Sequence, residues 1–422
     1  MTVFEKAKQL STREEFIETR EKSQKMADER FNAMKEYILS DACADDLSRL
    51  ESGDYFLDPP IFKQVPKNFR DRKRSVYYFT GSQSDLLKLL MFVLRDYEDH
   101  YSDRLYSFRS DRSGKDFLMT LRSGILNKYY ILKTDVSNYV GSIVPEIILP
   151  VLKTRYFSED PDFYSFLEWL LMRKKCIRNG EVIDHNPGGM GGVALSNFFM
   201  NVYLQEMDDN FENRSPLYFR YSDDILICAE TLEQAEQFKK EFYEILNRLQ
   251  LHVNDEKTMI IPPGAPVEIL GMYSYEGKLG ISQHSLRKIQ RKIRRVGDRL
   301  MYRTRKKEIT KEEAARSFIG YLNTYFFGLK GVNRLSWARW SFPVLTDPES
   351  LKTIDHYCQD TIRRILHGSC RRSRMKIPYS RLNELGYKSL LYVFHHPKMI
   401  EVIRENNLAE YEQWKKNHRV LQ

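Results

Sequence analysis

The sequence has little cysteine and no long apolar run. Its five cysteines, at positions 43, 176, 228, 358 and 370, are scattered and form no Cys-x-x-Cys pair. This pattern excludes a disulfide framework and predicts a reducing, cytoplasmic location. The four residues His356, Cys358, His367 and Cys370 match no common zinc-finger spacing, so we expect ordinary helix there rather than a zinc site.

Membrane insertion and secretion are not expected. The most apolar run, FYSFLEWLLM (163–172), is too short to cross a bilayer and is interrupted by Glu168. The start, MTVFEKAKQLSTREEF, lacks the apolar core of a signal peptide. We therefore predict no membrane partner.

What is present is a globular composition with an excess of positive charge. Of 422 residues, 42% are apolar and 13% aromatic, which excludes a disordered protein. Lys and Arg number 67 against 58 Asp and Glu, a net charge of +9. The excess indicates a polyanionic partner, and the length predicts several domains.

The order of patterns predicts an α+β fold. Residues 1–60 read as charged helices, whereas 131–282 alternate short strands with helices and glycine clusters. YYILKTDV (129–136) reads as a buried strand, and LYFRYSDDILICA (217–229) reads as strand, tight turn and strand. Thr231 with Gln234 predicts a capped helix after this hairpin. The result is a twisted sheet with helices on one face.

One helix carries the excess charge. Residues 285–310 contain eleven Lys or Arg and two acids, a local net charge of +9, opposite an apolar stripe. The stripe consists of Leu286, Ile289, Ile293, Val296 and Leu300. The basic face is either an ordinary solvated surface or a track for a nucleic-acid backbone.

Three carboxylates stand at strand ends. Asp223 and Asp224 form a hairpin corner, and Asp135 ends the strand at 129–136. Adjacent carboxylates repel each other, and a divalent cation relieves that repulsion. Oxygen ligands suit Mg²⁺, so the trio predicts a site for two Mg²⁺ ions and in-line phosphoryl transfer if the two strands are neighbours.

In this order the motifs resemble those of bacterial reverse transcriptases, across about residues 60–345. KTDVSNYVGSI (133–143), GGMGGVALSNFFMNVYL (188–204) and YSDD (221–224) are similar to the three central palm motifs of that family. The resemblance implies Asp135, Val136, Asp223 and Asp224 as metal ligands. LHVNDEKT (251–258) implies Lys257 as a catalytic residue near the incoming nucleotide, and VEILGM (267–272) implies Leu270 and Gly271 as a primer grip.

The same resemblance implies substrate contacts and a right-hand polymerase with a ferredoxin-like palm. Residues that would bind the nucleotide are Lys67, Arg74, Arg109, Tyr139, Val140, Gly192 and Ser196, and residues that would bind nucleic acid include Arg291, Arg294 and Arg295. The implied parts are a helical segment (1–60), fingers (61–130), a palm with inserted finger elements (131–282), a thumb (283–345) and a helical extension (346–422).

Three positions depart from the family pattern. Gly191 replaces the usual Gln of the second palm motif, and Ser222 replaces the usual Ala of the corner. The large aromatic residue that excludes a 2′-hydroxyl usually follows the first Asp by five residues, where this chain has Val140, with Tyr139 one place earlier. Either the register shifts by one residue or sugar discrimination is relaxed.

The expected function is RNA-templated DNA synthesis from deoxynucleoside triphosphates. By elimination among the bacterial branches, the pattern is closest to enzymes linked to phage defence, with a dedicated non-coding RNA and an accessory protein or second copy as possible partners. Two alternatives stay open. One is a template-independent or protein-primed polymerase, and the other is a non-catalytic, maturase-like RNA-binding protein.

Overall fold

The computed structural model describes residues 1–23, 28–66, 73–253, 258–330, 336–368 and 376–418. The chain divides into two compact units, one formed by residues 1–117 and 128–263 and the other by residues 118–127 and 264–422. Within the described ranges, no helix combines the length and apolarity that a bilayer crossing requires.

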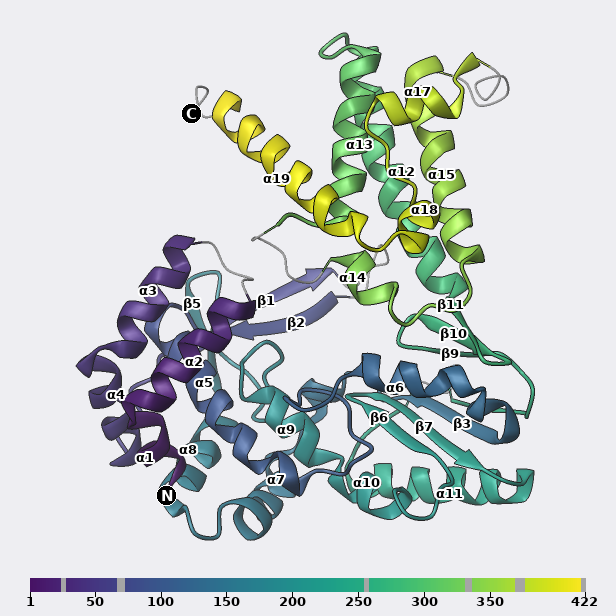
Figure 1. Ribbon diagram of the computed structural model, residues 1–422. Coiled ribbons are helices and arrows are strands. Elements are labelled where there is room, and N and C mark those ends of the chain that lie inside the picture. The colour runs from purple at the N-terminus through teal and green to yellow at the C-terminus, as the bar shows by residue number, and fades with distance from the viewer. Residues whose placement is uncertain (24–27, 67–72, 254–257, 331–335, 369–375, 419–422) are drawn as a thin grey trace. The chain divides into compact units, whose positions relative to one another are not determined.

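Helices from the N-terminal part of the first unit pack around α5 (Figure 1). A capping box between Thr2 and Glu5 starts the first of them. Phe4 is fully buried and meets Phe163 edge-on, with 5.3 Å between ring centroids. The segments that contact α5 (Gly81–Val93) are α1 (Val3–Lys8), α2 (Leu10–Ser23), α3 (Asp28–Leu39) and the 3₁₀ segment η1 (Leu94–His100). A further helix, α4 (Asp41–Glu51), packs on α1 and α3.

The first unit contains a small sheet of order β2-β1-β4-β5. Its strands are β1 (Ile61–Pro66), β2 (Lys73–Tyr78), β4 (Lys175–Arg178) and β5 (Glu181–Asp184). Asn179 and Gly180 form the two-residue turn between β4 and β5, with φ of 53° and 89°. Positive φ at both positions is the geometry that short hairpins favour, and Asn-Gly supplies it at low cost. The β4–β5 hairpin thus joins the β1–β2 hairpin in one sheet, although it lies about 100 residues further along the chain.

The second sheet of this unit has the order β6-β7-β3-β8, and all its pairs are antiparallel. Its strands are β3 (Tyr130–Asp135), β6 (Tyr218–Tyr221), β7 (Asp224–Ala229) and β8 (Met259–Ile261). Helices separate β3 from the β6–β7 hairpin, and α11 separates that hairpin from β8. This succession and strand order are those of the ferredoxin-like split βαβ. The α+β class and the ferredoxin-like palm expected from the sequence are therefore confirmed.

One helix covers a face of this sheet, as the sequence predicts. The helix α11 (Leu232–Arg248) packs on β3 and β7, and Figure 1 shows it along the sheet. Thr231 caps it by accepting a hydrogen bond from the backbone N–H of Gln234, at 3.1 Å. The other segments of the region are η4 (Tyr139–Ser142), α7 (Pro145–Val151), the π-helical turn η5 (Leu152–Tyr156), α8 (Pro161–Leu171), α9 (Ser196–Tyr203) and α10 (Gln205–Phe211).

The second unit combines a three-stranded sheet with a helical bundle. The sheet has the order β11-β10-β9, from β9 (Val267–Ile269), β10 (Met272–Tyr275) and β11 (Lys278–Ile281). It is separate from the β6-β7-β3-β8 sheet, a distinction that strand patterns in the sequence do not make. The short segments α6 (Gly114–Thr120), η2 (Leu121–Ser123) and η3 (Ile125–Lys128) lie at the point where the chain passes between the units.

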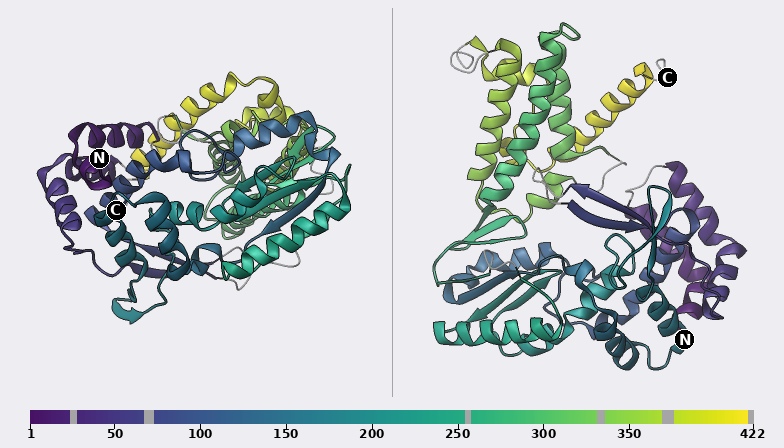
Figure 2. Two further views of the ribbon diagram at one scale, coloured as in Figure 1. Left: turned by 90° about the horizontal axis from the view of Figure 1, so that it is seen from below. Right: turned by 180° about the vertical axis from the view of Figure 1, so that it is seen from behind.

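Three long helices of this unit, α12, α13 and α15, pack against one another (Figures 1 and 2). The apolar stripe of α12 (Gln283–Arg305) is buried at Leu286, Ile289, Ile293 and Leu300, while Val296 is half-buried. Gly297 completes the buried face, because a Cβ there would lie 2.7 Å from Thr361 of α15. The remaining helices are α13 (Lys311–Phe327), α14 (Trp337–Ser341), α15 (Glu349–His367), α17 (Tyr379–Glu384), α18 (Leu390–His395) and α19 (Met399–His418).

Candidate active site

The predicted hairpin corner is a two-residue turn. Tyr221 ends β6 and pairs with Asp224, the first residue of β7, so Ser222 and Asp223 form the turn. Ser222 has φ 58°, which a two-residue hairpin favours at its first turn position although a side chain makes it costly. The strained turn presents Asp223 and Asp224 at the end of the sheet.

The third carboxylate lies beside this corner. Asp135 is the direct register partner of Asp224, and the backbone N–H of Val136 donates to the carbonyl of Asp223 at 3.2 Å. Burial raises the pKa of Asp223, and the charge of Asp135 raises it further. The sequence prediction that these two strands are neighbours is thereby met, and the two carboxylates are close enough to repel each other.

This donor set suits a hard cation that also takes ligands from a substrate. Among the described residues, no three His, Cys, Asp or Glu side chains form a ready metal cluster. The repulsion at Asp223 is nevertheless the condition that a divalent cation relieves. Mg²⁺ commonly binds one or two carboxylates and completes its shell with water and substrate phosphates. Asp135, Asp223 and Asp224 fit this arrangement.

A buried hydrogen-bond network holds the turn from behind. The hydroxyl of Ser107 accepts from the backbone N–H of Ser222 at 2.9 Å and donates to the side-chain carbonyl of Asn201 at 3.2 Å. The Asn201 amide donates back to the carbonyl of Ser107 at 3.0 Å. Ser107 and Asn201 are almost fully buried. Two distant segments therefore meet beneath the carboxylates.

An ion pair lies directly next to this network. Arg220, two residues before Ser222, is fully buried and donates to both carboxylate oxygens of Asp208 on α10, through Nε at 2.7 Å and through a second bond from Nη2. Burial alone would lower the pKa of Arg220, but the charge and hydrogen bonds of Asp208 raise it above its ordinary value. Arg220 also donates to the carbonyl of Asn201 at 3.0 Å, and Tyr218 donates to Asp208 at 2.7 Å.

Sequence reasoning did not single out Ser107, Asn201, Asp208 or Arg220 as site residues. Two signals pointed toward them. Asn201 is the first residue of the Asn-x-Tyr-Leu pattern, and Arg220 is a charged residue between apolar positions of a predicted buried strand. A fully buried Arg requires a paired acid, so the second signal implied a missing partner.

The structure separates the two candidates for the sugar-selecting position. Tyr139 is 3% exposed, and its hydroxyl donates to the backbone carbonyl of Met200, so its ring belongs to the core. Val140 is half-buried and lies 3.7 Å from the place of a Cβ on Gly191. No shift of register therefore brings Tyr139 to the glycine loop, and Val140 is the residue beside it.

The glycine loop is closely packed against protein backbone. A Cβ on Gly189 would lie 2.2 Å from the carbonyl of Val140, and one on Gly192, whose φ is 106°, would lie 2.7 Å from the carbonyl of Tyr77. The carbonyl of Gly191 accepts from the N–H of Tyr77 on β2 at 2.8 Å. Ser196, the first residue of α9, is buried and donates to the carbonyl of Met190 at 2.7 Å. These glycines and Ser196 therefore fix the loop.

The predicted basic substrate contacts differ in their surroundings. Arg74 is exposed on β2, whereas the side chain of Arg109 is 4% exposed and is held by both carboxylate oxygens of Asp111, at 2.8 and 2.9 Å. Lys67 and Lys257 lie outside the described residues.

The predicted nucleic-acid contacts lie in the second unit. Arg291, Arg294 and Arg295 are exposed on α12, and Arg294 lies 3.4 Å from Asp298. Leu270 and Gly271 form the two-residue turn between β9 and β10, with φ of 48° and 78°. This geometry is costly for leucine, so the turn presents Leu270 in a strained conformation.

A ferredoxin-like sheet with carboxylates at the ends of its first strand and central hairpin matches the palm of a right-hand nucleic-acid polymerase. Residues 66–274 match the family model described as reverse transcriptase (RNA-dependent DNA polymerase). Residues 66–274 therefore form a reverse transcriptase domain, as the motifs led us to expect.

A curated relative is the retron Ec86 reverse transcriptase of Escherichia coli, 19% identical over 236 residues, which are 56% of this chain and 69% of that protein. Similar solved structures include apo telomerase from Candida tropicalis without its C-terminal domain, with a TM-score of 0.43 and 14% identity over 53% of this chain. Apo telomerase from the same organism has a TM-score of 0.46 and 11% identity over 84% of this chain. This chain spans 56% and 63% of those two telomerase chains.

Proposed function

We propose that this protein joins deoxynucleotides to a primer 3′-hydroxyl, copies RNA and uses two Mg²⁺ ions held by Asp135, Asp223 and Asp224 with the backbone of Val136. The observation that carries the proposal is the register pair Asp135–Asp224, with Asp223 linked to the same strand through Val136. In this arrangement the three carboxylates and the Val136 carbonyl would all offer oxygen, the ligand atom that Mg²⁺ prefers.

In this mechanism the protein positions groups rather than reacting covalently. When bound, Mg²⁺ lowers the pKa of the attacking hydroxyl and stabilises charge on the leaving pyrophosphate. The Ser222–Asp223 turn, bonded to Ser107, holds the carboxylate geometry fixed during the reaction. Gly191 and Val140 form the wall that the incoming sugar would face, and exposed Arg74 on β2 is available to the triphosphate.

A primer-extension assay tests this function. The purified protein is incubated with an RNA template, a labelled primer, Mg²⁺ and each deoxynucleoside triphosphate. We expect template-directed extension that is lost with Asp223→Ala plus Asp224→Ala and kept in Glu230→Ala, which removes an exposed carboxylate after β7. Unchanged extension in the double variant would refute the mechanism.

Nuclease treatment separates this function from untemplated synthesis. If incorporation continues after complete removal of RNA, the template-independent or protein-primed alternative replaces our proposal. The further proposal of a dedicated non-coding RNA in antiphage defence is supported by the motif resemblance, and sequencing of co-purified nucleic acid tests it. A single enriched RNA species is expected, whereas random cellular RNA would refute that partner.

A further inference from the structure

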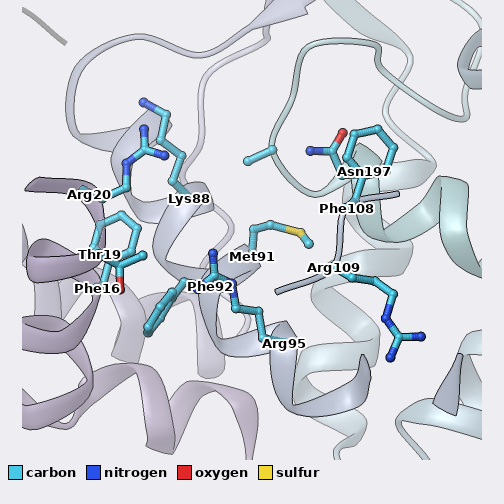
Figure 3. Close-up of a pocket in the computed structure, with 11 residues that line it drawn as sticks. Phe16, Thr19, Arg20, Lys88, Met91, Phe92, Arg95, Phe108, Arg109 and Asn197 are labelled. Atoms are coloured by element: carbon cyan, nitrogen blue, oxygen red, sulfur yellow. The ribbon is translucent and has the colours of Figure 1, made fainter. Parts of the chain in front are cut away.

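The first unit contains a pocket of about 310 Å³ that the proposed chemistry does not use. Helices α2 and α5 form one side, and the segment around Phe108 and the loop that precedes α9 form the other (Figure 3). In Figure 3, Arg20 and Lys88 extend on one side, Phe108 and Asn197 lie opposite, and Met91 lies between them. The volume is at the lower end of the range for small-molecule sites.

The pocket carries an excess of positive charge. Its described lining includes Arg20, Lys88, Arg95 and Arg109 but no carboxylate. Lys88 lies 3.1 Å from Asp85, and the guanidinium of Arg109 is bound by Asp111 and points away from the pocket.

The charges of Arg20 and Arg95 act on each other, and the guanidinium of Arg95 also lies over the ring of Phe92, 4.8 Å from its centroid. Burial lowers the pKa of Arg20, the charge of Asp85 opposes this shift, and the charge of Arg95 lowers the pKa further. Two guanidinium groups that repel each other at a pocket would be stabilised by an anion between them, and guanidinium geometry suits phosphate.

An aromatic ring is presented to the same pocket at a conformational cost. Phe108 has φ 55° and is 37% exposed. In the described part of the chain, its ring stacks on no other aromatic side chain. The neighbouring residues fix it in place, since Ser107 bonds to Ser222, and the backbone N–H of Ser110 donates to Glu98 at 2.8 Å. Rigid strain of this kind is typical of a functional position.

A polar group accompanies the ring. Asn197 is half-buried at the start of α9, and its side-chain amide makes no hydrogen bond to any residue that the structure describes. An amide offers both donors and an acceptor, as the edge of a nucleobase does. Within one pocket, the ring face and the amide match the base of a nucleotide, and the two guanidinium groups match its phosphates.

We propose that this pocket binds one nucleotide of a single-stranded polynucleotide, with the base against Phe108 and Asn197 and the adjoining phosphates at Arg20 and Arg95. A nucleotide within a strand has a phosphate on each side of its sugar, which suits cations contributed by two different helices. The choice of a polynucleotide rests on the proposed function, but binding here requires neither Mg²⁺ nor the carboxylates.

Fluorescence anisotropy with a labelled 12-nucleotide single-stranded RNA, in EDTA and at several salt concentrations, tests the site. Arg20→Gln plus Arg95→Gln is expected to weaken binding at least tenfold and to reduce the salt slope by about 1.4, for two lost phosphate contacts on a single strand. The matched control is Lys35→Gln plus Lys240→Gln, which removes the same charge from exposed positions of the first unit. It should bind like the wild type.

Phe108→Ala is expected to weaken binding about tenfold with an unchanged salt slope, because stacking carries no charge. Phe108→Tyr should restore binding, which separates a lost stack from a folding defect. The variant with Asp223→Ala plus Asp224→Ala should bind normally, so failure of the proposed catalysis would leave this result intact.

Wild-type affinity in both pocket variants would overturn the proposal. A second outcome would overturn the polynucleotide assignment. In it, free deoxynucleoside triphosphate displaces the RNA from the wild type at concentrations near the dissociation constant of the triphosphate, but does not displace it from Phe108→Ala. A p-benzoylphenylalanine at position 108 should crosslink to the RNA, and its failure to crosslink while the RNA is bound would also count against the site.

Discussion

The buried pair of Arg220 and Asp208 permits a quantitative prediction. Both side chains are almost fully buried, and their guanidinium and carboxylate are joined by two hydrogen bonds. Asp208→Asn keeps the size of the side chain and one oxygen acceptor but removes the negative charge. Among the described residues, Arg220 then keeps the backbone carbonyls of Met200 and Asn201 as further partners.

The expected cost follows from leaving one charge buried without its partner. Removing one member of such a pair costs about 3–5 kcal/mol. The first unit has about 250 residues, for which each kcal/mol lowers the melting temperature by about 2–4 °C. We therefore expect Asp208→Asn to lower the melting temperature by roughly 6–20 °C.

Removing both charges should cost less. In Arg220→Met plus Asp208→Leu no buried charge remains, and replacement of an ion pair by apolar residues is often neutral. Tyr218 loses its acceptor, so a residual cost of about 1–3 kcal/mol is expected. This variant also frees the backbone carbonyl of Asn201, whose side chain belongs to the hydrogen-bond network behind Ser222. We therefore expect the folded double variant to need a higher Mg²⁺ concentration for half-maximal primer extension.

Calorimetry of the two variants and a Mg²⁺ titration of primer extension measure these effects. The reasoning is refuted if Asp208→Asn melts within 2 °C of the wild type, because the pair would then not be desolvated as described. If the double variant is stable and has the wild-type Mg²⁺ requirement, the pair stabilises the fold without positioning the turn.

Four further predictions concern single features. Val140→Phe should reduce ribonucleotide incorporation relative to deoxynucleotide incorporation at least tenfold in kcat/KM, and a wild type that already rejects ribonucleotides would contradict it. The pKa of Asp223 is raised in the folded state. At pH values between the ordinary and the raised pKa, the folded protein keeps a proton that the unfolded chain releases, so the free energy of unfolding falls as pH rises. Asp223→Asn should remove that slope in metal-free melting curves and abolish stabilisation by Mg²⁺, whereas a retained slope would assign it to another group. Gly192→Ala should lower the free energy of unfolding, measured with denaturant, by about 2–4 kcal/mol. Gly180→Ala should lower it less, because its added Cβ would meet nothing within 4 Å. Equal losses in the two variants would refute the close contact between Gly192 and Tyr77. Neutralising Arg291, Arg294 and Arg295 should weaken duplex binding and flatten its salt dependence, and an unchanged slope would identify an ordinary solvated face.

Much of the sheet and its carboxylates could be predicted from the sequence because their signals are local. The hairpin around Ser222 is a polar corner between apolar β-forming residues, and the cap at Thr231 lies three residues from its partner. The assignment of β9–β11 to a separate sheet could not be predicted, because the alternation of a strand shows which face is buried and not which strand is its neighbour.

Tyr139 and the glycine loop show where local reasoning fails. From the sequence alone, Tyr139 could be a substrate contact or a core residue. Its hydrogen bond to the backbone carbonyl of Met200, 61 residues away, shows that it belongs to the core. Glycines likewise indicate a close approach without naming what approaches. Here the neighbours of Gly189 and Gly192 are backbone carbonyls of Val140 and Tyr77.

The segment that contains Ser107 and Phe108 connects the proposed metal site and the proposed nucleotide pocket of the first unit. Ser107 faces inward and bonds to the N–H of the strained Ser222, whereas Phe108 turns to the pocket through a positive φ. The positive φ is what permits consecutive side chains to serve these two places. Because the hydrogen bonds of Ser107 and Ser110 fix the backbone on both sides, a nucleotide against Phe108 and a metal at Asp223 would be held by one rigid element, so the position of a bound strand would be fixed relative to the carboxylates.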